Sequence, residues 1–148
     1  MSSWGRAYVP LLLGRTYKNL ENNTKSIEMY QLALAEAEKS NYKQARANVL
    51  SNLAEVYREL ELQNLELKSK NLDLALSYHF KALNLLQHLE AKCDLAEAYL
   101  QLGLTHQTMG KHDQAEECKA EALKLFAAIK APKQCDRVNK AFEQGAIK

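Results

Sequence analysis

The chain has 148 residues, 20 basic and 18 acidic, and a net charge of +2. This length is enough for one domain with a hydrophobic core, and the balanced charge argues against a nucleic-acid-binding protein. No apolar run approaches the roughly 20 residues that span a bilayer, so we expect no membrane association.

The three cysteines are an odd number and include no C-x-x-C pair, which argues against a disulfide framework and predicts a cytoplasmic protein. The first residues lack the charged and apolar regions of a signal peptide. A repeat begins almost at once, so we expect the chain to be a piece of a larger protein.

Apolar periodicity and few Gly and Pro residues predict an all-helical chain. We expect seven helices. The first begins near residues 6–9 and ends near 20, the second covers about 24–39, and the third begins near 43, passes through 60 and enters the excess within 61–70. The others are expected at about 72–89, 92–109, 113–129 and 133–144. Pro10 is expected in the first turn of the first helix, where its missing N–H costs little. Thr24 is the expected N-cap of the second helix, and Ser69 or Asn71 that of the fourth.

The other helix boundaries carry clearer signals. Gly110 is expected to end the fifth helix as a left-handed C-cap. Pro132 suits the first turn of the seventh helix. In that helix Val138 and Phe142 form one apolar stripe beside a charged face, which indicates a helix that caps the end of a stack.

One residue skeleton occurs three times. A leucine followed by a small residue begins the skeleton at Leu13, Leu53 and Leu102, and an aromatic or histidine stands three positions after the small residue. Each is followed by a second helix with small residues at helical spacing, and in the first two copies a tyrosine stands between them: Ser26, Tyr30 and Ala33; Ala75, Tyr78 and Ala82; Ala115 and Ala122. The copies are 40 and 49 residues apart, so the second carries about nine extra residues near 61–70.

These motifs resemble the tetratricopeptide repeat, a pair of antiparallel helices. The spacing of 40 exceeds the usual 34 and is similar to the longer-helix subgroup that includes kinesin light chains. Ser26 and His106 depart from the small and aromatic residues of the pattern. The resemblance implies an all-α, right-handed α-solenoid of three helix-turn-helix repeats plus a C-terminal capping helix.

The predicted organisation is a single domain, 1–148. Repeat 1 covers about 7–40, repeat 2 about 42–90, repeat 3 about 92–129 and the capping helix about 132–145. The insertion near 61–70 is rich in leucine. Either the two helices of repeat 2 extend by about a turn, which we prefer, or a loop folds back on the stack.

The small residues are expected to let helices approach closely, and Tyr17, Tyr30, Tyr57 and Tyr78 to fill the core between them. No motif for catalysis, a phosphate loop or a metal site is present, so we expect no enzyme, no cofactor and no bound metal. His106 is interpreted as a core substitute for the aromatic, and the cysteines as buried or half-buried apolar residues.

In a stack of this kind the first helices line a concave surface. The side chains one helical step from the Leu-Gly core are therefore the predicted partner-binding groove: Tyr8, Leu12, Arg15, Asn19, Asn48, Asn52, Glu55, Arg58, Gln101 and Thr108. An asparagine amide offers both a donor and an acceptor to a peptide group. The resemblance implies this role for Asn52, which we expect to be dispensable for folding.

The predicted function is a protein-protein interaction scaffold that binds a peptide or helical segment in this groove. The alternative is a regulatory or self-associating segment of a larger protein, which uses the stack ends or the leucine-rich insertion. The groove residues carry both signs of charge, so no nucleic-acid partner is expected, whereas a homo-oligomer stays open.

Overall fold

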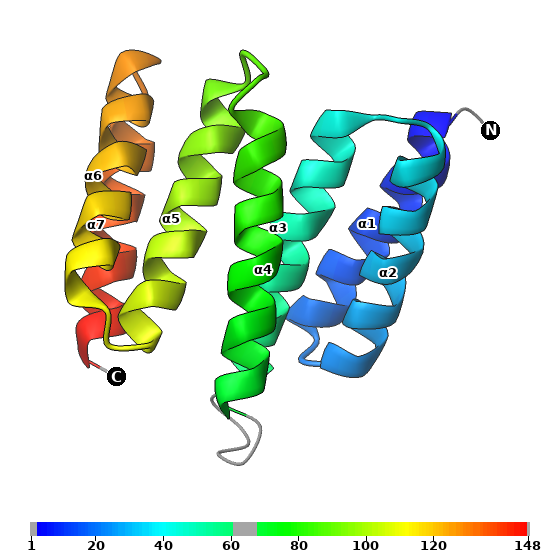
Figure 1. The fold of residues 1–148 in the computed structure, drawn as a ribbon, viewed down its shortest axis with the longest axis horizontal. Helices are drawn as coiled ribbons and strands as arrows, with labels where there is room; N and C mark the ends of the chain where they lie inside the picture. Colours follow the sequence, from blue (N-terminus) through cyan, green and yellow to red (C-terminus); the bar gives the residue numbers. More distant parts are fainter. Residues whose placement is uncertain (1–2, 61–67, 148) are drawn as a thin grey trace. The chain divides into compact units, whose positions relative to one another are not determined.

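The computed structural model describes residues 3–60 and 68–147, with side chains for 5–60 and 70–145. Within these residues the structure contains seven α-helices and no strand (Figure 1). They are α1 (Ser3–Asn19), α2 (Asn23–Lys39), α3 (Lys43–Leu60), α4 (Lys68–Leu86), α5 (Lys92–Thr108), α6 (His112–Ala128) and α7 (Pro132–Ile147). The all-α helical-repeat class is thus confirmed, while the handedness of the stack stays a prediction.

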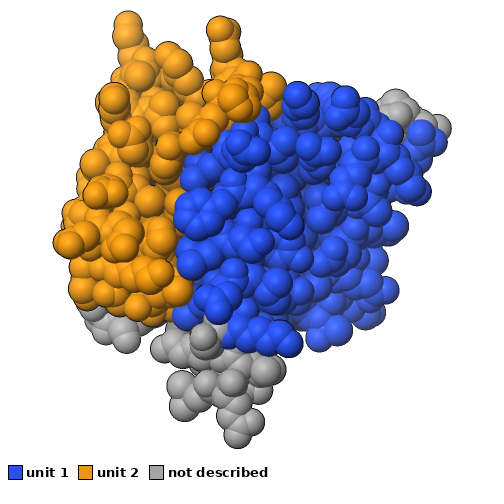
Figure 2. All heavy atoms as spheres, in the orientation of Figure 1, with its two compact units in different colours: residues 1–85 blue, residues 86–148 orange. Residues whose placement is uncertain are grey.

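Contacts divide the chain into two compact units, residues 1–85 and 86–148 (Figure 2). The first unit, called unit 1 below, contains α1, α2, α3 and nearly all of α4. Unit 2 contains α5, α6 and α7. Each unit has a buried apolar core of its own, centred on Tyr30 and Leu53 in unit 1 and on Leu100 and Phe126 in unit 2.

The start of α1 differs from the prediction. The helix begins at Ser3, so Pro10 lies in its interior and not in its first turn. Ala7 and Leu11, on either side of the proline, are both buried. Burying this face stabilises the helix by more than the loss of the backbone hydrogen bond at Pro10 destabilises it. In most protein helices packing contributes more to stability than local propensity does.

Two predicted N-caps were wrong. Asn22, not Thr24, caps α2, since its Oδ1 accepts a hydrogen bond of 3.2 Å from the Lys25 backbone N–H. Ser69 and Asn71 lie inside α4, which begins at Lys68. The choice between an extended hairpin and a folded-back loop falls on residues 61–67, outside the described part of the chain.

Four helices end in the same backbone motif, a left-handed residue just after the C-cap. Gly110 confirms the prediction with φ +75°, and Glu21, Asn41 and Lys130 take the same position with φ between 52° and 60°. After α5, the Gly110 N–H donates to the Gln107 carbonyl (3.0 Å) and the Lys111 N–H to the His106 carbonyl (2.9 Å). These bonds satisfy carbonyls that the helix end leaves open.

The small residues of the repeat lie where helices approach most closely. A Cβ atom at Gly14 would lie well inside van der Waals contact with the Tyr30 ring, and one at Gly103 would lie 2.6 Å from the Phe142 ring. Ala33, Ala54, Ala82 and Ala122, their counterparts in the other helices, are fully buried. The structure therefore agrees with the expected role of these residues.

The tyrosines only partly match the prediction. Tyr30 is fully buried, and burial raises its pKa to about 12. Tyr57 and Tyr78 are half-buried and stack at 5.8 Å between ring centroids, and Tyr17 is half-buried under the Lys25 ammonium. These three rings cover the edge of the core instead of filling it.

Both departures from the repeat pattern are buried. Ser26 replaces a small apolar residue, and its hydroxyl donates to the Gly14 carbonyl at 2.8 Å, so its polar atom is satisfied. His106 replaces an aromatic and is buried as expected, but its Nδ1 has no hydrogen-bond partner among the described residues. Burial, and then the nearby Lys111 charge, lower the pKa of His106.

Helix α7 has the predicted two-sided character. Val138 and Phe142 are buried in the core of unit 2, against residues that include Leu100 and Phe126. Lys133 and Lys140 on its other side are exposed.

The helix ends generate a first prediction. Lys130→Gly should raise the free energy of unfolding by about 0.5–1 kcal/mol, because only glycine adopts a left-handed backbone without steric cost. Gly110→Ala should lower it by about 1 kcal/mol, and an added Cβ there meets no atom, so the loss would reflect the backbone alone. Urea unfolding of both variants is the test, and equal midpoints would contradict it.

His106 generates a second prediction. Its lowered pKa means that the unfolded chain binds a proton more readily than the folded chain, so His106 destabilises the protein as the pH falls below about 6.5. The stability advantage of His106→Phe over wild type should therefore increase from pH 7.5 to pH 5. A constant difference across urea unfolding curves at these pH values would contradict it.

Candidate peptide-binding groove

The predicted groove residues all lie on the first helix of a repeat, as expected. Eight of them are on α1 and α3 in unit 1, and Gln101 and Thr108 are on α5 in unit 2. Helices α1 and α3 contact each other directly. On α1, Tyr8, Leu12 and Arg15 follow one another at helical spacing and are all exposed.

A pocket of about 250 Å³ lies between α1 and the N-terminal half of α3. Its lining combines apolar side chains with polar ones: Ala7, Leu11, Ala45 and Val49 with Tyr8, Arg15, Tyr42, Gln44 and Asn48. Three of the predicted residues, Tyr8, Arg15 and Asn48, are thus brought together from two helices.

Tyr42 and Gln44 line the same pocket and were missed by the sequence analysis. Gln44 lies four residues before Asn48, so extending the helical spacing by one turn would have found it. Tyr42 precedes α3 in the turn after α2, where helical periodicity gives no signal. A residue of this kind can be placed only once the turn is known.

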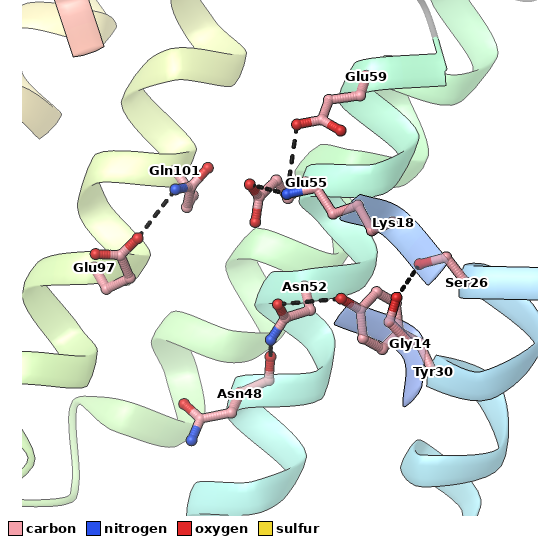
Figure 3. Close-up of polar contacts among 10 residues, drawn as sticks. All are labelled: Gly14, Lys18, Ser26, Tyr30, Asn48, Asn52, Glu55, Glu59, Glu97 and Gln101. Atoms are coloured by element: carbon pink, nitrogen blue, oxygen red, sulfur yellow. Dashed lines mark hydrogen bonds and ion pairs between the residues drawn. The ribbon is translucent and has the colours of Figure 1, made fainter. Parts of the chain in front are cut away.

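The charges of unit 1 are unevenly paired. Lys18 on α1 forms ion pairs with Glu55 and, at 3.5 Å, with Glu59 on α3 (Figure 3). Lys18 thus offsets one of the two negative charges on this side of the groove. Arg15, one turn earlier on α1, has no ion pair among the described residues and lines the pocket. The pocket therefore presents an available positive charge to a ligand.

Asn52 is tied to the core. Its Oδ1 accepts a long hydrogen bond of 3.4 Å from the Tyr30 hydroxyl, and its Nδ2 donates to the Asn48 carbonyl at 2.6 Å (Figure 3). An amide has two donor hydrogens and two acceptor lone pairs, so one of each stays available for a ligand. The Tyr30 hydroxyl is buried, so replacing Asn52 would remove its hydrogen-bond acceptor and destabilise the fold. This contact argues against the expectation that Asn52 is dispensable for folding.

The two predicted residues of unit 2 form contacts within that unit. Gln101 is only 8% exposed, and its Nε2 donates to Glu97 at 3.1 Å (Figure 3). Glu97 also pairs with Arg137 of α7. The Thr108 hydroxyl donates to the Leu104 carbonyl at 2.9 Å. Gln101 is thus less accessible than a groove residue is expected to be.

The remaining predicted residues differ in exposure. Leu12 and Asn19 are exposed on α1, and Arg58 is half-buried on α3. None of these three lines the pocket.

The titratable groups of the described residues offer little for catalysis. No group of three His, Cys, Asp or Glu side chains there could hold a metal ion. Burial, and then Glu117 and Glu121, raise the pKa of the Cys118 thiol to about 11, so it is protonated and a poor nucleophile at neutral pH. Cys93 is exposed, contrary to the expectation that all three cysteines are at least half-buried.

None of the helices in the described ranges has the length and apolar character needed to cross a bilayer.

Comparisons with known proteins identify the repeat. The family model described as "Tetratricopeptide repeat" matches residues 11–46 and 96–129. The crystal structure of BtubC (BKLC) from P. vanneervenii is similar, with 21% sequence identity and a TM-score of 0.69 over 95% of this chain. The match covers 58% of the BtubC chain, and at this identity it shows the fold alone. No curated protein matches the chain.

Proposed function

Because the chain belongs to the tetratricopeptide repeat family, whose repeats generally mediate protein-protein interactions, we propose that it binds an extended segment of a protein partner between α1 and α3. The observation that carries this proposal is the pocket in which Tyr8, Arg15 and Asn48 converge from two helices. A pocket with an apolar floor and a few polar groups is the usual form of a recognition site.

The chemistry of the lining suggests how the segment is held. The Arg15 guanidinium, which has no ion pair among the described residues, can form two parallel hydrogen bonds with a carboxylate. The Asn48 amide offers a donor and an acceptor to a peptide group. The rings of Tyr8 and Tyr42 present apolar surface with little conformational freedom to lose, which suits the binding of a flexible chain.

The proposal gives Asn52 an indirect role. Its bond to the Asn48 carbonyl fixes one side of α3 next to the pocket, and its bond to Tyr30 links that side to the core of unit 1. A site that is already rigid loses less conformational entropy when a ligand binds. The affinity of the groove is therefore expected to depend on the packing of Tyr30 as well as on the lining residues.

A third prediction tests the groove with peptides selected on the protein itself. Random peptides displayed on phage should be enriched on wild type. The enriched peptides should bind Arg15→Glu/Asn48→Ala at least about tenfold more weakly by fluorescence anisotropy, which corresponds to about 1.4 kcal/mol. This loss is expected because the variant removes a charge-assisted contact and an amide contact.

Lys124→Glu is the matched control, since it makes the same charge change at an exposed position of α6. Circular dichroism confirms that all variants fold. If no peptide is enriched, or if the groove variant and the control bind equally well, the proposed function is wrong.

A further inference from the structure

A row of polar side chains runs along α3 from the pocket toward the C-terminal end of the helix. Its five members share one face of α3, at intervals of three or four residues: Gln44, Asn48, Asn52, Glu55 and Glu59. Figure 3 shows the last four of them along one side of the helix. The row therefore changes from neutral amides beside the pocket to two carboxylates at its far end.

The carboxylate end carries an excess of negative charge. Glu55 and Glu59 stand one turn apart, and like charges at this spacing destabilise a helix unless a cation lies near them. Lys18 of α1 supplies one ammonium for both, in close contact with Glu55 and 3.5 Å from Glu59. Arg58, the residue before Glu59, points about 100° away around the helix. Two carboxylates against one ammonium leave a net negative charge at this end of the row.

Glu59 is the carboxylate that is better placed to meet a ligand. Its side chain is 40% exposed, against 23% for Glu55, and its distance from the shared ammonium is the longer one. A carboxylate has about four lone-pair sites, so a single partner such as Lys18 leaves most of them available.

The pocket end of the groove has the opposite sign. Arg15 lines the pocket beside Asn48 and has no ion pair among the described residues. Burial raises the pKa of the Tyr30 hydroxyl, Glu55 raises it further and Arg15 lowers it. Because both charges act on the same hydroxyl, the two ends of the row belong to one surface of unit 1. The groove is thus positive at the pocket and negative at Glu59.

The distance between the two ends determines how far apart complementary charges on a ligand must be. Asn48 precedes Glu55 by seven residues and Glu59 by eleven. These separations correspond to about 10 and 16 Å along the helix axis. An extended chain covers about 3.3 Å per residue, so the same distance spans about three to five residues of a bound segment.

We propose that the segment bound between α1 and α3 carries an acidic and a basic side chain about three to five residues apart, the acidic one on Arg15 and the basic one on Glu59. This inference rests on the proposed function, because it describes the ligand of the same groove. Two fixed charges of opposite sign hold a segment in one register, and they disfavour a segment of one sign alone. A uniformly acidic segment, for example, would bring a like charge to Glu59.

A fourth prediction concerns the peptides that phage display enriches on the full chain. An acidic and a basic residue about three to five positions apart should be more frequent in them than in the unselected library. Glu59→Lys should weaken their binding about fivefold by fluorescence anisotropy, because it brings an ammonium to their basic residue. Glu59→Gln removes the charge and keeps the shape, so it should weaken binding less.

An exchange of charges across the contact makes the test specific. A peptide whose basic residue is replaced by glutamate should bind wild type about fivefold more weakly, and it should regain affinity for Glu59→Lys. A variant that had merely lost its fold would not bind the exchanged peptide. Glu28→Lys is the matched control, since it makes the same charge change at an exposed position of α2. It should bind both peptides as wild type does.

The outcomes separate this inference from the proposed function. Suppose that the enriched peptides depend on Arg15 and Asn48 but bind Glu59→Lys as well as wild type, or that the exchanged peptide regains no affinity for Glu59→Lys. The groove then binds its ligand without Glu59, and only the inference is wrong. If no peptide is enriched, or if Arg15→Glu/Asn48→Ala binds like Lys124→Glu, the proposed function is wrong and the inference fails with it.

Discussion

The close approach of α1 and α2 at Gly14 is the constraint on which unit 1 depends. Because Gly14 has no side chain, the Tyr30 ring of α2 packs directly on the α1 backbone, and Ser26 of the same helix bonds the Gly14 carbonyl. The buried Tyr30 hydroxyl then reaches Asn52 on α3. One missing Cβ atom thus permits a chain of contacts across three helices. In unit 2 the pair of Gly103 and Phe142 brings α5 and α7 together in a similar way.

These contacts fix the surface proposed to bind a partner. One side of α1 packs against α2 and α3, and its remaining sides face outward in two directions. Tyr8 and Arg15 line the pocket beside α3, and Val9 and Leu13 are exposed on another side of the helix. A rigid helix can present two separate surfaces because its own backbone hydrogen bonds are satisfied internally.

Much of the fold could be predicted from the sequence, because the periodic leucines and the Leu-Gly pairs report directly on buried faces. Gly110 and Pro132 marked helix boundaries through backbone geometry alone. The errors have two different causes. Burial of Ala7 and Leu11, a tertiary effect, moved the start of α1. The N-cap of α2 moved for a local reason, because the left-handed Glu21 places Asn22 at the cap position. For the candidate site, helical spacing was enough to identify Tyr8, Arg15 and Asn48. The burial of Gln101 and the ion pair of Lys18 depend on contacts between different helices, which the periodicity of one helix does not report.

The most direct test of the packing constraint is the effect of Gly14→Ala on urea unfolding, in wild type and in Tyr30→Leu. At an exposed helix position this change stabilises a protein by about 0.5–1 kcal/mol, because alanine favours the helix. The packing described above predicts the opposite sign in wild type, a loss of about 1–3 kcal/mol from overpacking against the ring. In Tyr30→Leu, where the ring is gone, the loss should disappear or reverse. If Gly14→Ala stabilises wild type, Gly14 is not a point of close approach and the account of unit 1 is wrong.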